Sequence, residues 1–340
     1  MKILYGVQAT GNGHIARSRI MAKQLKESGV DVTFLFSGRS KDKLFDMEPF
    51  DHFIYKQGLT FTVKNGKVKY LSTVLNNNFA RFLYDVYTLP VEDYDLIITD
   101  FEPITAWAAK LKNKQVLGIG HQYAFGNNTP RSGKSLLAEL VMNYFAPAKE
   151  FMGLHWAPFD QSILPPIIDV NLTGKAEDNL VLVYLPFENQ GKVTRLLQKF
   201  PDKHFIQYSP DVNNGEDKNV SIRTTCYAGF KRDLCRSSAV ISNSGFELIS
   251  ECLHLGLPIL VKPLEGQMEQ ESNALALQKL QFAEVMHTLN QDIIANWLTT
   301  VKVIKRQKTP DVAAALVKYL LSNKKLPAQT VAASLWQQYE

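Results

Sequence analysis

Short apolar runs alternate with longer amphipathic segments along most of the chain, a pattern typical of strands alternating with helices. Residues 2–7 are expected to form a strand, and residues 15–28 carry apolar side chains at helical spacing after a glycine-rich loop. Gly29 is expected to end this helix, and residues 32–36 have the composition of a second buried strand. A strand, a helix and a strand in this order predict a doubly wound parallel sheet, whose ligands bind at the carboxyl ends of its strands.

The same alternation continues through the second half of the chain. Further strands are expected at residues 96–99, 115–119, 180–185, 205–208, 220–222, 239–241 and 259–261. Periodicity is lost at residues 156–166, which contain three prolines, so an interdomain linker is expected there. Because a chain of 340 residues usually divides into more than one core, we predict an α/β protein with two Rossmann-like, doubly wound domains, residues 1–163 and 164–325, and a short segment at residues 326–340.

Two segments of the first half depart from this alternation. Residues 58–70 alternate apolar and polar side chains around Asn65-Gly66, which predicts a β-hairpin inserted near the binding cleft. A stripe of apolar residues at helical spacing follows and is expected to pack in the core: Phe79, Phe82, Leu83, Val86 and Tyr87. Because lysines lie nearby in the sequence, the alternative is that this stripe meets a lipid-linked ligand or a membrane surface.

Candidate chemistry begins in the first glycine-rich loop. The sequence GNGHIA at residues 11–16 satisfies the dinucleotide-binding spacing GxGxxA, and Arg39 follows the second strand, where it could accept a 2′-phosphate. Taken alone, this loop indicates an NADP-dependent oxidoreductase. Asp100 ends the strand at residues 96–99, so Asp100 and His14 are both expected at carboxyl ends of strands in one sheet.

The stretch from residue 242 to residue 274, SNSGFELISECLHLGLPILVKPLEGQMEQESNA, holds the densest polar chemistry of the chain. A short buried strand precedes it, and small polar residues with glycine then open a helix. Backbone N–H groups around Ser244, Gly245 and Phe246 have no partner within such a helix, and the helix dipole favours an anion beside them. This turn is therefore a candidate cradle for a diphosphate.

Polar side chains follow at spacings that suit a sugar nucleotide. Glu251 lies seven residues after Ser244, about two helical turns, so its carboxylate stays on the same side and can accept both hydroxyls of a ribose. Glu269, Gln270 and Asn273 begin the next helix and can bind the hydroxyls of a sugar. The alternative for each of these residues is a local role, as a helix cap or a solvated helix position.

This stretch resembles the donor-binding region of GT-B glycosyltransferases, most closely the MurG type, in which SG, a helix with SE, GLP and a glutamine loop ending in NA recur. The matching residues are Ser244, Gly245, Ser250, Glu251, Gly256, Leu257, Pro258, Gln270, Asn273 and Ala274. In that family the glutamate binds the nucleotide ribose and an acidic residue with the glutamine binds the donor hexose, which implies Glu251 and the pair Glu269 and Gln270. Glu247 and Glu265 have no counterpart in this pattern, and the glutamine loop differs in length, which leaves the donor sugar open.

The first loop is similar to the glycine-rich loop at the same place in GT-B enzymes, with one glycine fewer than the MurG form. The matching residues are Gly11, Asn12, Gly13 and His14. Plant UDP-glycosyltransferases, which look similar here, use a His and Asp pair at matching places. The resemblance therefore implies His14 as the base that deprotonates the acceptor and Asp100 as its orienting partner. The alternatives are that His14 and Asp100 only cap helices or contact phosphate, and that His121, at another strand end, is the base.

The resemblance also implies an architecture and a reaction. Two domains would face each other across a cleft, the first holding an acceptor and the second a nucleoside-diphosphate sugar, with a terminal helix in residues 326–340 crossing back to the first. The implied reaction is an inverting transfer of a hexose to a carbohydrate or lipid-linked acceptor. Donor phosphates in this fold are met by helix dipoles and backbone N–H groups, so neither a metal nor a cofactor besides the donor is implied.

Charge narrows the partners further. The net charge is +5, and residues 1–165 account for +4 of it, with 19 basic and 15 acidic residues. This mild excess is compatible with an acidic acceptor or an anionic membrane surface, but no basic run with interleaved aromatics suggests nucleic acid. No segment approaches the roughly 18 apolar residues needed to span a bilayer, so any membrane contact is expected to be peripheral.

Neither carboxylates nor cysteines indicate a metal site. The sequence from Asp93 to Asp95 has the DxD spelling of metal-dependent transferases, but it precedes a strand and so lies at the edge of the sheet away from the ligand. We interpret it as a charged turn. Cys226, Cys235 and Cys252 are odd in number and not closely paired, which argues against a disulfide framework and for a cytoplasmic protein, at the inner face of the membrane if it binds there.

Three other functions stay open at this point. A sugar-nucleotide epimerase shares the fold and the nucleotide site, and an NADP-dependent oxidoreductase would use the first loop but would not need the stretch at residues 242–274. A sensor that binds a nucleotide sugar without turnover is the non-enzyme case. A sequence without a histidine at position 14 would favour it, but His14 is present. Released nucleotide, epimerised sugar or no product from a nucleotide sugar distinguishes the transferase, the epimerase and the sensor.

Overall fold

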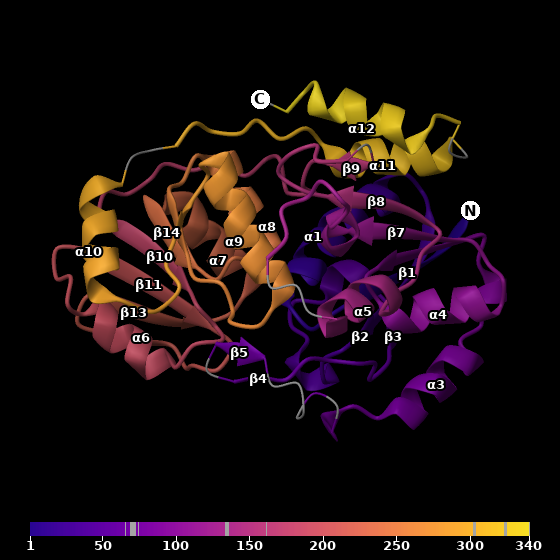
Figure 1. Ribbon diagram of the computed structural model, residues 1–340, viewed down its shortest axis with the longest axis horizontal. Helices are drawn as coiled ribbons and strands as arrows, with labels where there is room; N and C mark the ends of the chain where they lie inside the picture. The colour runs from indigo at the N-terminus through magenta and orange to yellow at the C-terminus, as the bar shows by residue number, and fades with distance from the viewer. Residues whose placement is uncertain are drawn as a thin grey trace.

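The computed structural model describes residues 1–64, 66–68, 73, 75–132, 136–160, 162–301, 304–322 and 325–339. Two seven-stranded sheets dominate the molecule, and each forms the centre of its own lobe (Figure 1). Neighbouring strands are parallel throughout both sheets except at one edge of the second. The prediction of an α/β protein with two Rossmann-like domains is confirmed.

The first sheet has the strand order β3-β2-β1-β6-β7-β8-β9. Its strands are β1 (Lys2–Gln8), β2 (Asp31–Ser37), β3 (Ile54–Tyr55), β6 (Leu96–Asp100), β7 (Val116–Gly120), β8 (Glu150–Leu154) and β9 (Ile163–Leu164). From β1 the chain winds outward through β2 to β3 and then returns to β6 on the other side of β1. The switch point of this sheet therefore lies between the carboxyl ends of β1 and β6, which is where an open α/β sheet binds its ligand.

Helices cover both faces of this sheet. They are α1 (Asn12–Glu27), α3 (Phe79–Thr88), α4 (Pro103–Leu111) and α5 (Leu136–Tyr144), with short 3₁₀ turns η1 (Lys41–Lys43), η2 (Glu48–Phe50), η3 (Val91–Asp93) and η4 (His121–Ala124). The side chains of β1 alternate between two apolar cores: Ile3 and Tyr5 pack on the α1 side, whereas Leu4 packs with Val86 of α3 and Ile104 of α4. Burial on both faces explains why this strand is apolar at nearly every position.

The second sheet repeats this plan in the order β12-β13-β11-β10-β14-β15-β16. Its strands are β10 (Leu180–Tyr184), β11 (His204–Ser209), β12 (Gly215–Asp217), β13 (Val220–Thr224), β14 (Ala239–Ser242), β15 (Ile259–Val261) and β16 (Glu284–Val285), and its helices are α6 (Gln190–Leu197), α7 (Tyr227–Arg236), α8 (Phe246–Leu255), α9 (Met268–Leu280) and α10 (Gln291–Thr300). The edge strand β12 is antiparallel to β13. Because the chain returns from β13 to β14 beside β10, the second switch point lies between the carboxyl ends of β10 and β14.

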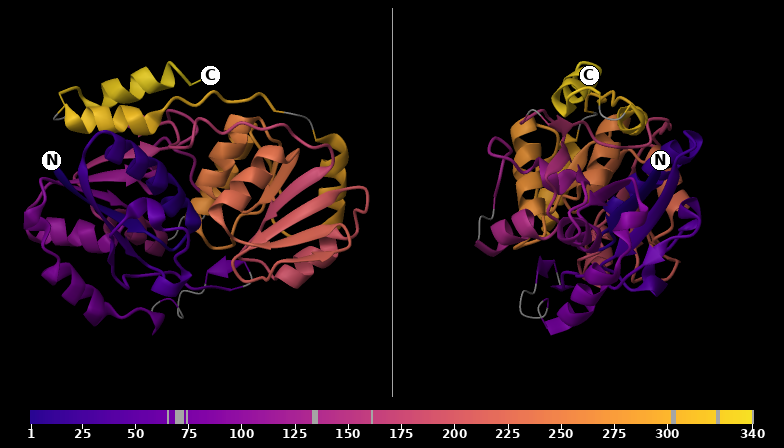
Figure 2. Two further views of the ribbon diagram at one scale, coloured as in Figure 1. Left: turned by 180° about the vertical axis from the view of Figure 1, so that it is seen from behind. Right: turned by 90° about the vertical axis from the view of Figure 1, so that its right-hand side faces the viewer.

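The last two helices lie against the first lobe (Figure 2). They are α11 (Val312–Leu321), which packs on α1, and α12 (Ala328–Trp336), which packs on β9. The indole N–H of Trp336 donates to the carbonyl oxygen of Ile163 at 2.7 Å. The sequence-based boundary at residue 325 assigned α11 to the second domain, whereas its contacts are with the first. None of the helices in the described ranges combines the length and apolarity needed to cross a bilayer.

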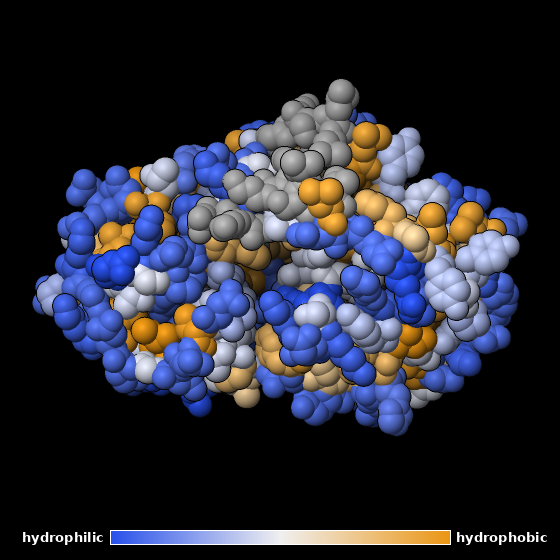
Figure 3. Space-filling model, turned by 90° about the horizontal axis from the view of Figure 1, so that it is seen from below, coloured by the Kyte–Doolittle hydropathy of each residue, from blue (hydrophilic) through white to orange (hydrophobic). Residues whose placement is uncertain are grey.

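The apolar stripe expected in the core is instead largely on the surface, so that prediction is wrong for α3. Exposed side chains on this helix are Phe79, Leu83, Tyr84 and Tyr87. Val86 and, in part, Phe82 pack in the core cluster with α4, and on the same inner side the buried carboxylate of Asp85 meets the ammonium group of Lys56 at 2.9 Å. Apolar and aromatic residues accordingly gather among hydrophilic ones on the right-hand side of Figure 3, where α3 lies in Figure 1.

The hairpin predicted at residues 58–70 is present, and its turn is tied to the second lobe. Its strands are β4 (Val63–Lys64) and β5 (Lys67–Val68), while Asn65 lies outside the described residues. Gly66 has a φ of 71°, a left-handed conformation that glycine takes without strain. Its N–H donates to the carbonyl oxygen of Phe187 at 2.8 Å, and its own carbonyl oxygen accepts from the N–H of Glu265 at 2.9 Å. The hairpin therefore spans the domain interface.

Candidate active site

The two switch points face each other across the domain interface. Helix α1 follows β1 and helix α8 follows β14, and the two helices pack against each other. A Cβ atom on Gly13 would lie 3.1 Å from Cγ of Glu247, in the first turn of α8. Space is open at the N-cap of each helix, since a Cβ atom on Gly11 or Gly245 would meet nothing within 4 Å, and neither helix has a side-chain cap. Both N-termini thus offer unpaired N–H groups of the kind that bind anions.

The first switch point brings His14 and Asp100 together. His14 lies on the first turn of α1 and Asp100 is the last residue of β6, and Nδ1 of the histidine is 2.9 Å from Oδ1 of the aspartate. Asp100 is fully buried, whereas the histidine side chain is 13% exposed. The pairing that the sequence suggested is therefore present, with the imidazole at the rim and the carboxylate beneath it.

Arg17 completes this group, although it is not among the site residues predicted from the sequence. Its guanidinium binds Asp100 through two hydrogen bonds, from Nε to Oδ2 at 2.7 Å and from Nη2 to Oδ1 at 2.5 Å. Burial by itself raises the pKa of Asp100, but Arg17 and His14 together hold that pKa below its ordinary value. Arg17 follows His14 by three residues, so the two share one face of α1, a spacing that could have indicated the contact.

Two groups contact Nδ1 of His14, the Asp100 carboxylate and the Arg17 guanidinium. Because the Asp100 carboxylate can only accept, we assign the proton to Nδ1, although Nη2 of Arg17 also lies 2.8 Å from that nitrogen. The lone pair is then on Nε2, which lies 3.3 Å from the amide nitrogen of Gln122. The same amide donates to Oε2 of Glu269 at 2.9 Å, so a chain of contacts runs from the imidazole across the interface to the second lobe.

Glu247 joins the two lobes through Arg17. Its Oε1 accepts a hydrogen bond of 2.5 Å from Nη1 of Arg17, and its side chain is 6% exposed. Burial raises the pKa of Glu247 to about 7, and the Arg17 guanidinium offsets that rise only in part. This carboxyl group, which matches nothing in the MurG pattern, is therefore a titratable contact between the domains.

The residues predicted to cradle phosphate and hexose also support one another. The hydroxyl of Ser244 donates to the carbonyl oxygen of Gln270 at 2.8 Å, and the amide of Asn273 donates to the carbonyl oxygen of Ser244 at 2.9 Å. Oε1 of Gln270 accepts the N–H of Leu264 at 3.1 Å. Gln270 and Asn273 are buried and fix the turn before α8, whereas Glu269 reaches the interface.

Glu251 lies within the second lobe rather than at its surface. It is 3% exposed and forms an ion pair with Lys231 of α7 through Oε1. Burial lowers the pKa of Lys231, but Glu251 more than offsets this and the net shift is upward. The neighbouring Ser250 accepts a hydrogen bond of 2.9 Å from the indole N–H of Trp156 in the first lobe. Ribose hydroxyls could use the remaining oxygen of Glu251 or displace Lys231.

His121 does not have a free nitrogen. Its Nδ1 lies 2.8 Å from the carbonyl oxygen of Leu154, and its Nε2 lies 2.7 Å from Oδ1 of Asn273. The ring is fully buried and stacks on Phe246 with 4.0 Å between centroids. Burial lowers its pKa. His121 therefore bridges the lobes, and this arrangement leaves it no lone pair directed at a substrate.

Arg39 and the acidic turn at residues 93–95 were the candidates for binding a 2′-phosphate and a metal ion, and both make other contacts. Arg39 donates to Oδ1 of Asn12 at 2.7 Å and to the carbonyl oxygen of Thr10 at 3.1 Å, so it supports the first loop. Asp95 accepts the N–H of Lys2 at 2.7 Å, at the amino end of β1 and opposite the site. Within the described ranges no group of three His, Cys, Asp or Glu side chains is arranged to hold a metal ion, and the three cysteines are unpaired.

Two Rossmann-like lobes with both switch points at one interface, and a terminal helix on the first lobe, define the GT-B fold. The model of the family described as "Glycosyl transferase family 1" matches residues 1–302 of this chain. The chain therefore belongs to glycosyl transferase family 1, and the MurG-like resemblance is confirmed. Membership of this family supports glycosyl transfer as the activity of the chain.

Solved structures with the same fold cover nearly the whole chain. The glycosyltransferase SnogD from Streptomyces nogalater is 17% identical, with a TM-score of 0.54 and 99% of each chain covered. The calicheamicin glycosyltransferase CalG4 is 14% identical, with a TM-score of 0.58 and coverage of 99% of this chain and 98% of that one. MurG from Acinetobacter baumannii is 13% identical, with a TM-score of 0.55 and coverage of 99% and 100%. A search of curated proteins found no match.

The interface carboxyl group makes stability depend on pH. A raised pKa means that folding favours the protonated form of Glu247, so the stabilisation is complete below pH 4.5 and is lost as the pH rises through about 7. The loss is on the order of 3 kcal/mol, since each tenfold change in proton affinity corresponds to about 1.4 kcal/mol. Glu247→Gln, which mimics the protonated form, is expected to have a thermal midpoint that falls less over this range than that of the parent.

The matched control is Glu139→Gln, the same change at an exposed glutamate of α5. This variant should follow the parent at every pH. Identical pH dependence in the parent and in Glu247→Gln would show that Glu247 is ionised throughout.

Proposed function

We propose that the protein transfers a hexose from a nucleoside-diphosphate sugar, held by the second domain, to a hydroxyl group of a carbohydrate or lipid-linked acceptor, held by the first. The observation that carries this proposal is the His14–Asp100 pair at one switch point, facing the uncapped N-terminus of α8 at the other. A base and an anion site on opposite sides of one interface are what a direct sugar transfer requires.

The proposed step balances with these groups alone. As the acceptor oxygen attacks the anomeric carbon, its proton moves to Nε2 of His14, a new carbon–oxygen bond forms, and the bond to the diphosphate breaks. Negative charge grows on the leaving phosphate, where the N–H groups after Gly245 and the dipole of α8 stabilise it. Asp100 stabilises the imidazolium that forms, and it is available as a carboxylate because Arg17 keeps its pKa low.

Two features support inversion and independence from metal as part of this proposal. The proposed base lies on the first lobe, and the proposed binding site for the leaving diphosphate lies on the second. This arrangement suits attack on the face of the sugar opposite the diphosphate. Helix N–H groups can meet the phosphate charge without a cation. Glu269 is proposed to bind the hexose, because its contact with Gln122 places it beside His14.

Incubation with UDP-, GDP-, CDP- and dTDP-hexoses tests the proposal as a whole. Release of nucleoside diphosphate is expected with one or more of them. Epimerised sugar without release would instead assign the same site to an epimerase, and binding without any product would make the protein a sensor. Reduction of a substrate at the expense of NADPH would contradict the proposal.

The catalytic pair is tested with His14→Ala, Asp100→Asn and the double variant. His14→Ala is expected to lower kcat by about 10²–10⁴, the usual contribution of a general base. The double variant should lose little more than His14→Ala, because the two groups act as a unit. His52→Ala, an exposed histidine of the same lobe, is the control. Unchanged turnover in His14→Ala would remove it as the base.

The donor site is tested with Glu251→Gln and a titration of nucleoside diphosphate. Loss of the charged acceptor for ribose is expected to weaken binding about tenfold or more, since hydrogen bonds to charged groups are worth about 1.5–3 kcal/mol. Lys231→Met removes the ion pair but keeps the carboxylate, so it should weaken binding less. Glu284→Gln, at an exposed glutamate of the second lobe, should bind as the parent does. Equal losses in Glu251→Gln and Lys231→Met would make the pair structural only.

Peripheral membrane contact is part of the proposal, and the exposed apolar side of α3 supports it. Leu83 is 62% exposed on this helix, so Leu83→Asp is expected to reduce co-sedimentation with vesicles that contain anionic lipid. Leu326→Asp, at a residue 56% exposed before α12, is the control. Equal sedimentation of the two variants and the parent would exclude α3 as a membrane contact.

A further inference from the structure

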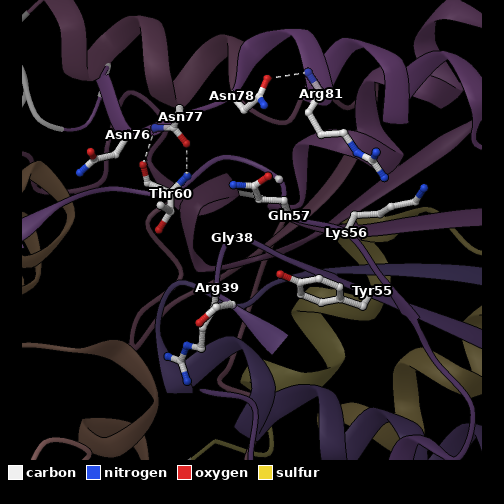
Figure 4. A pocket seen from close by; sticks show the side chains of 12 residues that line it. Gly38, Arg39, Tyr55, Lys56, Gln57, Thr60, Asn76, Asn77, Asn78 and Arg81 are labelled. Carbon is white, nitrogen blue, oxygen red and sulfur yellow. Dashed lines mark hydrogen bonds between the residues drawn. The ribbon is translucent and has the colours of Figure 1, made fainter. Parts of the chain in front are cut away.

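A polar cavity of about 580 Å³ opens in the first lobe at the carboxyl ends of β2 and β3 (Figure 4). Its walls come from three segments: the turn after β2 with Gly38 and Arg39, the segment after β3 with Lys56 and Gln57, and the first turn of α3 with Arg81 and the residues before it. No described residue of its lining is a carboxylate. The sugar transfer proposed for the interface gives this cavity no role.

Two of its cations are held in place by a carboxylate behind the wall. Asp85 is fully buried and binds Nζ of Lys56 at 2.9 Å and Nε of Arg81 at 3.2 Å. In Figure 4 the charged ends of Lys56 and Arg81 lie on the same side of the cavity. Two cations share one anion here, so this side of the cavity carries a net positive charge.

Arg39 adds a third cation that has no acidic partner among the described residues. Its guanidinium donates to oxygens of Thr10, Asn12 and Lys43, all of them uncharged. The cavity wall is therefore joined to the loop that leads to His14, two residues after Asn12. Arg39 is thus the residue that connects the cavity with the loop that carries the proposed base.

Hydrogen-bonding groups in the cavity are also free. Within the described part of the chain, neither Nη atom of Arg81 has a hydrogen-bond partner, and the same holds for the hydroxyl of Tyr55 and the amide of Gln57. By contrast, Asn77 uses its amide to bind the backbone of Thr60, which fixes the wall. Free donors on a fixed frame are the arrangement that binds a phosphate or carboxylate.

We propose that this cavity binds an anionic group of the acceptor, a phosphate or a carboxylate, while the acceptor hydroxyl reaches His14. The inference rests on the proposed sugar transfer and names the class of acceptor. The donor diphosphate is a separate anion, since its proposed site is the N-terminus of α8 on the other lobe. The acceptor is thus an anionic carbohydrate or a lipid with an anionic headgroup.

Binding of inorganic phosphate and of glucuronate, with glucose as the neutral counterpart, tests the proposal. The parent protein should bind both anions and not glucose, and affinity should fall with added salt. Arg81→Gln is chosen because Lys56 still pairs with Asp85 in that variant. It is expected to weaken anion binding about tenfold, as loss of a charge-assisted contact does. Arg81→Lys should recover part of the loss.

Controls separate this site from others. Lys26→Gln removes an exposed lysine that pairs with Asp51 elsewhere in the same lobe, and it should bind anions as the parent does. Arg39→Gln, a second variant in the cavity, should resemble Arg81→Gln. Nucleoside diphosphate binding should be unchanged in all of these variants. Anion binding that is equal in the parent, Arg81→Gln and Lys26→Gln would overturn the proposal, as would glucose binding as tightly as glucuronate.

Two further experiments identify the source of the anion and distinguish failure of this proposal from failure of the proposed sugar transfer. Vesicles of phosphatidylcholine with phosphatidic acid, but not without it, should retain the parent more than Arg81→Gln if the anion is a lipid headgroup. Preference for soluble glucuronate or phosphate instead assigns a soluble acceptor. If no nucleotide sugar is consumed but Arg81-dependent anion binding persists, the transfer has failed and the anion site stands.

Discussion

The structure depends on a guanidinium placed between two carboxyl groups. Arg17 is almost fully buried, and it binds Asp100 of its own lobe and Glu247 of the other. A buried charge is stable only when it is paired, and Arg17 is the partner that both carboxyl groups share, so removing the arginine leaves both of them without a counter-charge. The arginine thereby links two tasks: it keeps the carboxylate beneath His14 ionised, and it holds the N-termini of α1 and α8 together.

This link connects the chemistry to the closure of the interface. The contacts that cross between the lobes include charge pairs, backbone hydrogen bonds at Gly66 and the stacking of His121 on Phe246. Most of them lie at or near strand ends that carry candidate site residues. An opening of the lobes would separate Gln122 from Glu269, and hence the base from the group proposed to bind the sugar. Contact between the lobes is therefore a condition for assembly of the proposed site.

The first lobe carries the features that set it apart from a simple Rossmann domain. The hairpin, the inward turn of Asp85 and the apolar outer side of α3 all come from the segment between β3 and β6. The same segment supplies Lys56, Gln57 and Arg81 to the polar cavity. One segment thus builds the side of the first lobe that is proposed to bind the acceptor, while the second lobe keeps the regular alternation of strand and helix. That division matches the proposed roles, in which the second domain binds the donor and the first binds the acceptor.

Local sequence patterns were enough to predict the architecture and to place the candidate site residues at the ends of strands. Strands buried on both faces are apolar throughout, and helix starts carry glycine and small polar residues, so the two sheets and the turns at Gly11 and Gly245 could be predicted from these patterns. The position of His14 and Asp100 at strand ends followed from the same reasoning. The MurG-like motifs then indicated sugar transfer.

Which side chains meet was settled by packing between elements that are distant in the chain. Arg17 and Glu247 lie 230 positions apart, and a contact of that span leaves no periodic trace in either segment. Glu251 has the spacing of an exposed helix residue but is buried by Lys231 from another helix. The stripe on α3 has core periodicity, yet most of its side chains are exposed, while Asp85 of the same helix is buried against Lys56. Spacing in a sequence reports which face of an element a residue occupies, whereas packing between elements decides what covers that face.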